Sequence, residues 1–248
     1  MNLNTTTLLP KVIVYHETVS NDFYNKVLSL DQSKWTNWGA FGLYLRLATN
    51  EYIGDPLEFS STTEETDETI VSLINEFNKI FKETTLDYIQ KNDVVLPNWQ
   101  TATPQLSKYH TKKVKFHNLI LPFHTDYQQE RSKMPGIKHG ITANLYINDD
   151  YKGGEILFNM EGSDDVIKYK PKAGDMIVFP SGLPYYHGVR NVIEGEKYLI
   201  RSFWHFREEG DPEYMKEKEK WTPEEWKEKE TLRQKIERNK YMKWIKVN

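Results

Sequence analysis

The spacing of apolar residues predicts helices and one strand in the first half of the chain. Residues 11–15 are rich in Val and Ile and predict a short strand, and Ser20 offers an N-cap for a helix that follows it. Aromatic and small residues mix through 35–50, which predicts another strand. From Ile70 to Tyr88, apolar residues recur at three- and four-residue steps, so a longer helix with a single apolar face is expected here.

The pattern changes in the middle of the chain, where short apolar runs are separated by Gly, Pro and Asp turn signals and no helical period interrupts them. The expected strands lie at 114–124, 140–149, 154–160, 166–170, 175–180 and 197–206. Short strands at this spacing are typical of an antiparallel sandwich or jelly roll. The predicted fold class is therefore mainly β with flanking helices.

The last segment, 207–248, is rich in charged and aromatic residues. Thr222 to Glu225 form a capping box with Pro at the first helical position, so a charged C-terminal helix is expected to follow. This pattern predicts a single domain at 1–206, in which 1–112 supports a β core at 113–206, and a C-terminal helical extension. Mixed charge favours a solvated helix that packs its few apolar residues on the core, with an interaction tail as the alternative.

Composition narrows the classes of function. The 248 residues carry 33 Lys+Arg against 36 Asp+Glu, a net charge of −3, so no global basic field exists to hold a nucleic-acid backbone. The absence of cysteine excludes disulfides, thiolate metal sites and cysteine nucleophiles, and any bound metal must use His, Asp or Glu. Without a secretory signal or an apolar run long enough to span a bilayer, the expectation is a cytoplasmic protein with no membrane partner. The oligomeric state stays open.

One histidine motif indicates metal chemistry. Of the seven histidines, only His124 is followed at the second position by a carboxylate, Asp126. Positions i and i+2 of a strand share a face, so the imidazole and the carboxylate are presented side by side. His187, after the turn at 180–182, is the best candidate for a third ligand. Two His and one carboxylate form the facial triad of non-haem Fe(II) oxygenases, whereas a single His-x-Asp also arises by chance on a surface strand.

Four ordered motifs resemble a known family. They are HTD at 124–126, YKGGEILF at 151–158, KPKAGDMIVFPS at 170–181 and HGVRNVIEGEKYLIRSFW at 187–204. Together they resemble the Fe(II)- and 2-oxoglutarate-dependent dioxygenases, in particular the prolyl 4-hydroxylase-like branch. The resemblance implies a double-stranded β-helix (jelly roll) core. It also implies that His124, Asp126 and His187 act as the catalytic metal ligands, with 2-oxoglutarate and O2 as cosubstrates and ascorbate as an optional reductant.

The resemblance also implies a basic residue that pairs with the far (C5) carboxylate of 2-oxoglutarate. Lys197 stands where the family pattern has this residue. Arg201 is the rival, because it shares a strand face with Lys197 and could grip a carboxylate with two hydrogen bonds. Thr142 and Tyr146 alternate on one face of a strand on which similar enzymes often carry a hydroxyl contact to the cosubstrate. For Thr142, a role in strand formation alone is an equal alternative.

The function that the resemblance implies is hydroxylation of an unactivated C–H bond, with release of succinate and CO2. The branch suggests a prolyl residue in a peptide, or a free amino acid, as the substrate. Tyr127 and Arg131, in a long polar segment at 127–139, are candidates for substrate contact. Two alternatives stay open: a catalytically silent jelly-roll binding module, and a nucleic-acid oxidative demethylase on the same fold, against which the acidic charge argues.

Overall fold

The protein is built mainly from antiparallel strands. The computed structural model describes residues 3–31, 35–37, 42–46, 52–53, 68–92, 94, 99–101, 104–109, 111, 119–126 and 137–207. The predicted C-terminal helix, and Tyr127 and Arg131, lie outside the described residues. Arg207, the last described residue, still belongs to the final strand, one residue beyond the predicted core.

The larger of two main sheets contains ten strands and gathers segments from both halves of the described chain. Eight of them run in the order β1-β2-β13-β9-β16-β7-β4-β3, with β6 on β16 and β5 on β6. Their bounds are β1 Thr5–Leu9, β2 Val12–Tyr15, β3 Thr36–Asn37, β4 Gly42–Arg46, β5 Tyr52–Ile53, β6 Trp99–Thr101, β7 Gln105–Tyr109, β9 Ile137–Tyr146, β13 Met176–Pro180 and β16 Lys197–Arg207. The support region and the core therefore share one sheet.

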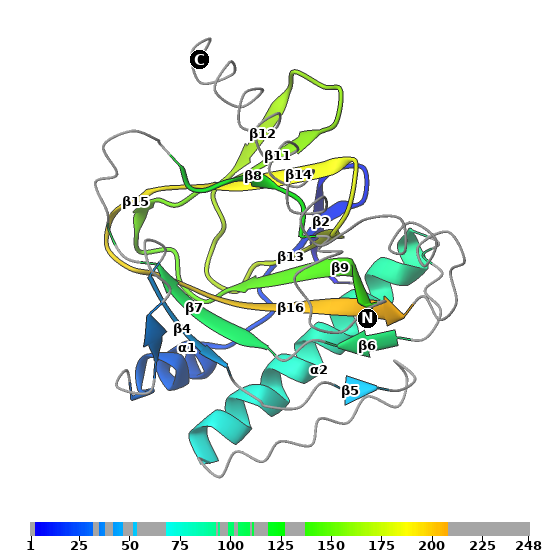
Figure 1. Ribbon diagram of the computed structural model, residues 1–248. Coiled ribbons are helices and arrows are strands. Elements are labelled where there is room, and N and C mark those ends of the chain that lie inside the picture. The colour runs from blue at the N-terminus through cyan, green and yellow to red at the C-terminus, as the bar shows by residue number, and fades with distance from the viewer. Residues whose placement is uncertain are drawn as a thin grey trace, which may run out of the picture.

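A second sheet of four strands faces the first across the interior (Figure 1). Its order is β12-β11-β14-β8, with β8 Leu119–His124, β11 Ile156–Met160, β12 Val166–Tyr169 and β14 Tyr185–Arg190. A small pair, β10 Lys152–Gly153 and β15 Val192–Glu194, lies at one end. Two facing antiparallel sheets confirm the predicted jelly-roll architecture.

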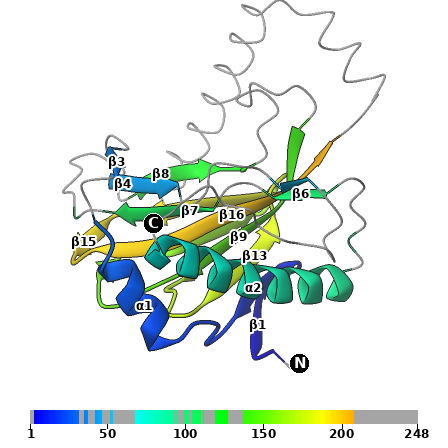
Figure 2. The same ribbon diagram turned by 90° about the horizontal axis from the view of Figure 1, so that it is seen from below.

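Two helices cover the outer face of the large sheet (Figure 2). They are α1 (Asn21–Leu28) and α2 (Glu68–Lys91). The side chain of Ser20 accepts a hydrogen bond from the backbone N–H of Phe23 at 3.2 Å, which confirms the predicted N-cap. The apolar face of α2 packs on the sheet, where Phe81 stacks on Trp204 with ring centroids 5.3 Å apart. Trp204 is therefore a core residue.

Strand β16 separates the two apolar layers of the molecule. Tyr198, Ile200 and Trp204 belong to the cluster between the large sheet and the helices, whereas Leu199 belongs to the cluster between the two sheets. Because side chains alternate along a strand, Lys197 and Arg201 lie on the same face as Leu199. Both cations are thus directed into the space between the sheets.

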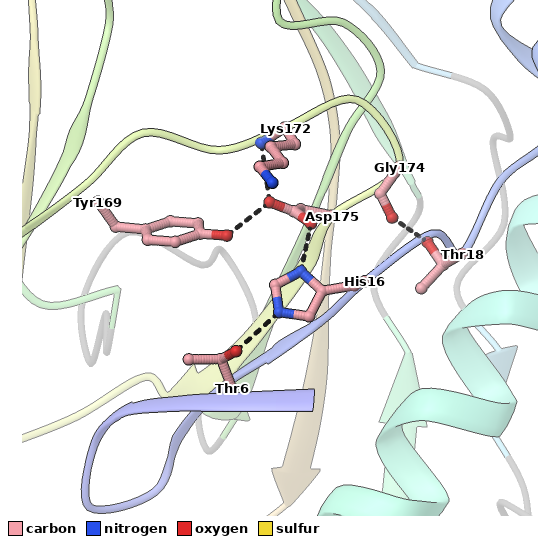
Figure 3. A network of polar contacts seen from close by, with 7 residues as sticks. All are labelled: Thr6, His16, Thr18, Tyr169, Lys172, Gly174 and Asp175. Atoms are coloured by element: carbon pink, nitrogen blue, oxygen red, sulfur yellow. Dashed lines mark hydrogen bonds and ion pairs between the residues drawn. The ribbon is translucent and has the colours of Figure 1, made fainter. Parts of the chain in front are cut away.

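A polar network links the N-terminal hairpin to residues 169–175, which lead into β13 (Figure 3). His16 Nδ1 lies 2.8 Å from Asp175 Oδ1, and its Nε2 lies 2.8 Å from Thr6 Oγ1. The other oxygen of Asp175 accepts hydrogen bonds from the Tyr169 hydroxyl at 2.7 Å and the Lys172 backbone N–H at 2.8 Å. Asp175 is 1% exposed, so the contacts from His16, Tyr169 and Lys172 satisfy a buried carboxylate that would otherwise destabilise the fold.

Candidate active site

Three side chains from three separate positions meet at one end of the space between the sheets. His124 ends β8, Asp126 follows it after one residue, and His187 lies in β14. Strands β8 and β14 pair with His124 directly opposite His187, and the two imidazole centroids lie 4.3 Å apart. The register of this strand pair therefore brings together two residues that are 63 positions apart in the chain.

The donor atoms of this cluster fit a single metal ion. Nε2 of His124 lies 3.4 Å from Asp126 Oδ1, and Nε2 of His187 lies 3.4 Å from Asp126 Oδ2. One donor atom from each residue can be chosen so that all lie within 4.8 Å of one another. Bonds of about 2.1 Å from a common ion place two donors roughly 3 to 4 Å apart. Two imidazoles and one carboxylate are also the donor set of a non-haem Fe(II) site.

Neighbouring groups orient two of these donors. Nδ1 of His124 lies 2.8 Å from the carbonyl oxygen of Pro122, so it donates its proton there and leaves Nε2 with a free lone pair. Asp126 Oδ2 accepts a hydrogen bond from the Thr142 hydroxyl at 2.9 Å, and this hydroxyl lies 2.8 Å from Ser181 Oγ. The carboxylate is therefore held in place from β9 and from the turn after β13.

Burial and nearby charges set the protonation states of His187 and Asp126 that binding of a cation requires. Burial lowers the pKa of His187 to about 3, so its imidazole is neutral at physiological pH and can donate a lone pair. Burial alone would raise the pKa of Asp126. The neighbouring imidazoles of His187 and His124 and the Arg201 guanidinium outweigh this effect and hold the pKa well below its usual range. Asp126 is therefore ionised in the folded protein.

Lys197 occupies a second buried position, lined by tyrosines. It is 0% exposed, and its Nζ lies 5.7 Å, 5.0 Å and 5.8 Å from the ring centroids of Tyr109, Tyr146 and Tyr151, respectively. Nζ donates a hydrogen bond of 2.6 Å to the carbonyl oxygen of Gly154. Burial, assisted by the nearby charge of Lys170, lowers the pKa of Lys197 to about 7. We call Lys197 and these three tyrosines the tyrosine pocket.

The tyrosine pocket offers donors to an acceptor. The hydroxyl of Tyr151 is buried and has no hydrogen-bond partner among the described residues. An ammonium group has three N–H donors, and the bond to Gly154 uses one of them. Buried donors of this kind are costly unless they are paired. A carboxylate from a ligand would satisfy both Lys197 and Tyr151.

All the residues predicted to bind the metal or to contact the cosubstrate are among the described residues. Thr142 and Tyr146 share a face of β9, as predicted, but the Thr142 hydroxyl is engaged by Asp126 and Ser181, so its contact with a cosubstrate stays a prediction. Arg201 lies on the same inner face as Lys197, and its Nη2 donates to Gln105 Oε1 at 3.1 Å.

The sequence pattern missed several residues of the site. The pattern places Ser181 only in a turn, although its hydroxyl lies beside that of Thr142. Tyr109 lies on β7, a strand that the pattern does not predict, and Tyr151 lies within a motif that predicts no role for it. The Tyr151-Lys152-Gly153-Gly154 sequence was itself a signal, because two positive φ values of 73° and 68° turn this segment toward Lys197.

Comparisons with known proteins agree with this geometry. A model of the 2OG-Fe(II) oxygenase superfamily matches residues 104–205. Prolyl 3-hydroxylase 2 of Rattus norvegicus is 42% identical over 60 residues, and prolyl 3-hydroxylase 3 of Mus musculus is 36% identical over 62 residues. These matches cover 24% and 25% of this chain, and each spans only 8% of the relative's own length.

A solved structure shows the same fold. The Trichoplax adhaerens prolyl hydroxylase, solved in complex with a hypoxia inducible factor oxygen degradation domain peptide fragment, is similar with a TM-score of 0.52 at 15% identity. The alignment covers 80% of this chain and 84% of that one. The double-stranded β-helix expected from the sequence is therefore the fold of this chain.

The fold, the family match and the His-Asp-His cluster agree with one another. Residues 104–205 match the 2OG-Fe(II) oxygenase superfamily, and His124, Asp126 and His187 all lie within this segment. The chain is similar to prolyl hydroxylases in sequence over about 60 residues and in its overall fold. None of the described helices is long and apolar enough to cross a membrane.

Proposed function

We propose that the protein is an Fe(II)- and 2-oxoglutarate-dependent oxygenase that hydroxylates an unactivated C–H bond of a prolyl residue in a peptide, or of a free amino acid. The observation that carries this proposal is the convergence of His124, Asp126 and His187 on one point between the sheets. When bound there, iron supplies the oxidising chemistry with O2 and 2-oxoglutarate, which is converted to succinate and CO2.

The proposed ligands have divided roles. His124 and His187 would give one nitrogen each, and ionised Asp126 would supply a negative charge that offsets part of the charge of the cation. With only three protein ligands, a bound iron would keep coordination positions for the cosubstrate and O2. The hydroxyl of Thr142 keeps the Asp126 carboxylate at a fixed angle, which preserves this open arrangement.

Lys197 is the proposed partner of the C5 carboxylate of 2-oxoglutarate, with Tyr146 beside it. A dicarboxylate that chelates the metal at one end carries its second charge into the interior, where it requires a partner. Lys197 is buried there, and its Nζ lies 5.8 Å from the ring centroid of Tyr151, whose hydroxyl has no hydrogen-bond partner among the described residues. These groups orient the cosubstrate and exclude water from the far end of the site.

The proposed substrate rests only on the similarity of this chain to prolyl hydroxylases. The curated relatives are prolyl 3-hydroxylases, whereas the motifs of this chain resemble the prolyl 4-hydroxylase-like pattern, so hydroxylation at either ring carbon is to be tested. Ascorbate is proposed as a reductant that sustains turnover.

The test supplies the purified protein with Fe(II), 2-oxoglutarate and ascorbate. Succinate formation is followed by mass spectrometry, together with a +16 Da product across a panel of proline-containing peptides and free amino acids. We expect succinate from the wild-type protein and none from the His124→Ala/Asp126→Ala double variant. An active double variant, or a wild-type protein that binds Fe(II) and 2-oxoglutarate but releases no succinate with any substrate, would refute the proposal. The second result would favour the silent binding module.

A further inference from the structure

Three side chains at the edge of the large sheet form a hydrogen-bonded chain of hydroxyl, imidazole and carboxylate (Figure 3). Oγ1 of Thr6 lies 2.8 Å from Nε2 of His16, and Nδ1 of the same ring lies 2.8 Å from Oδ1 of Asp175. These residues come from β1, from the end of β2 and from the turn before β13. None of them belongs to the metal cluster or to the tyrosine pocket. We call them the threonine triad.

The direction of the hydrogen bonds in the threonine triad follows from the other partners of Asp175. Its Oδ2 accepts from the Tyr169 hydroxyl and from the Lys172 backbone N–H, so the carboxylate acts as an acceptor on both sides. Nδ1 of His16 therefore carries the proton toward Asp175, and Nε2 is left with a lone pair. The Thr6 hydroxyl consequently donates to Nε2. A base that activates a hydroxyl nucleophile is oriented in this way.

Exposure increases along the threonine triad from the acid to the hydroxyl. Asp175 is buried, the side chain of His16 is 19% exposed, and Thr6 is exposed. A reagent from solvent can therefore reach the Thr6 hydroxyl, while the carboxylate that orients the imidazole is shielded from water.

The strand register places the base beside Thr6 and not beside its neighbour. Thr6 stands opposite Val14, which packs between the two sheets, and His16 is two residues beyond Val14. Thr6 and His16 therefore project from the same face. Thr7 is also exposed, but it projects from the other face of β1. The chain thus offers two adjacent exposed hydroxyls, of which Thr6 has the imidazole as its partner.

The open edge of the sheet supplies a hydrogen-bond donor next to Thr6. Among the described residues, β1 is the outermost strand on its side of the large sheet. The His16 N–H donates to the Asn4 carbonyl at 2.9 Å. Because the antiparallel ladder alternates, Thr6 and Val14 form the next hydrogen-bonded pair, and the Thr7 N–H points away from β2. A carbonyl compound at Thr6 could place its oxygen on this N–H as negative charge develops there.

The backbone beside His16 is bonded to the turn that carries Asp175. Glu17, the residue after His16, has a φ of +56°, a left-handed value that is uncommon outside glycine. Beyond this sharp bend, the N–H and the hydroxyl of Thr18 both donate to the carbonyl oxygen of Gly174 at 2.8 Å. Gly174 directly precedes Asp175. The base and the acid therefore lie on segments that are bonded to each other, which preserves their alignment.

We propose that Thr6 is a nucleophile toward acyl esters, with His16 as its base and Asp175 as the group that orients the base. The Thr6 oxygen forms a bond to the ester carbonyl carbon while its proton passes to Nε2 of His16. The bond from that carbon to the leaving oxygen then breaks, and His16 returns the proton to the leaving alcohol. Water later attacks the acyl-threonine by the same proton route, which releases the carboxylic acid and restores the hydroxyl.

The test uses 4-nitrophenyl acetate as the ester and the full chain without metal or cosubstrate. Release of 4-nitrophenolate gives the rate, and mass spectrometry of peptides after an acid quench locates the acetyl group. We expect an acetyl ester on Thr6 and none on Thr7, the exposed hydroxyl without a base. Hydroxylamine at neutral pH should remove this ester, whereas acetyl amides formed on lysines should persist.

Variants separate activation by His16 from simple exposure of a hydroxyl. His16→Gln keeps a polar side chain without the base and should slow acetylation of residue 6 by about 100-fold or more. Thr6→Val should abolish it, and Thr6→Ser should retain it, which supplies the test if His16→Gln does not fold. Thr111→Val is the matched control, because it removes an exposed hydroxyl that donates to the Gly195 carbonyl, and it should leave the rate at Thr6 unchanged.

Several results would overturn the inference. Acetylation of lysines alone would show that Thr6 is not a nucleophile. Equal acetylation of Thr6 and Thr7 would reduce the effect to exposure, and an unchanged rate in a folded His16→Gln variant would remove His16 as the base. The inference does not depend on iron, and Thr6→Val should still release succinate in the oxygenase assay. Failure of the proposed oxygenase function and failure of this inference are therefore distinguishable.

Discussion

Removal of the buried lysine should stabilise the protein without ligand, and the size of this gain should depend on pH. In the Lys197→Met variant, a group whose pKa is lowered from 10.5 to about 7 is replaced by an apolar chain of similar length. The unfolded chain binds a proton at this lysine up to about pH 10.5, whereas the folded chain loses it near pH 7. Between these values the unfolded state binds more protons, so the stability of the wild-type protein rises with pH.

The pKa shift gives the magnitude of this effect. A shift from 10.5 to about 7 corresponds to a destabilisation of about 4 kcal/mol at pH 7 and about 2 kcal/mol at pH 9, at 1.36 kcal/mol per pH unit. The difference in unfolding free energy between the variant and the wild-type protein should therefore shrink by about 2 kcal/mol from pH 7 to pH 9. Loss of the bond to Gly154 offsets part of the gain at either pH but leaves this change with pH intact.

Urea unfolding of both proteins at pH 7, 8 and 9, without metal or cosubstrate, measures this difference. The Lys168→Met variant is the control, because an exposed lysine should leave the pH profile parallel to that of the wild-type protein. Other titrating groups cancel in the comparison, since they are common to both chains. Parallel profiles for wild type and Lys197→Met would show that the lysine is not desolvated in the folded protein, and the argument for a buried C5 partner would fail with it.

Four further changes test other parts of the structure. Asp126→Asn removes the negative charge of the metal site and should weaken Mn(II) binding by at least about 10-fold in equilibrium dialysis, because a neutral amide is a poor ligand for a hard cation; unchanged affinity would refute the ligand assignment. Thr142→Val should weaken Mn(II) binding by about 10-fold, since an outer-shell hydrogen bond to a ligand is lost, and Thr18→Val, which also loses a hydroxyl but lies far along the chain, should not. Gly154→Ala places a Cβ 2.8 Å from the Tyr151 ring at a φ of +68°, so a loss of about 1–3 kcal/mol in unfolding free energy and weaker 2-oxoglutarate binding are expected; wild-type values for both would show that the tyrosine pocket tolerates displacement. Asp175→Ala leaves His16, Tyr169 and the Lys172 backbone N–H without their shared acceptor, and thermal unfolding should show a loss of about 2–4 kcal/mol; a loss below 1 kcal/mol would mean that solvent replaces the carboxylate.

Sequence patterns predicted those parts of the molecule that depend on local order. Val12–Tyr15 and Met176–Pro180 are continuous apolar runs, and both are strands covered on both faces, as such runs predict. The three- and four-residue period from Ile70 identified α2 because that helix buries one face against a sheet. The His-x-Asp motif depends only on the two-residue period of an extended chain.

The surroundings of the predicted site residues Lys197 and Thr142, which the sequence did not predict, depend on contacts between distant segments. Lys197 follows a Gly-Glu turn and resembles a solvated hairpin lysine, and only the closure of three tyrosines from three other segments buries it. Thr142 and Ser181 meet across 39 positions because β9 pairs with β13, a register that neither segment specifies by itself. The short strand at Gln105–Tyr109 has little alternation of its own and is fixed by its pairing with β16.

The large sheet has a consequence for how the chain acquires its activity. Its strand β2 pairs with β13, more than 160 positions later, and β9 is completed on its other side by β16, among the last described residues. Contacts of such long sequence separation form slowly, and during synthesis β2 must wait until most of the polypeptide has left the ribosome. A nascent chain that ends just after His187 would hold every candidate metal ligand but lack the strand that carries both cations. The residues proposed to contact the cosubstrate on β16 are therefore the last part of the candidate site to be synthesised.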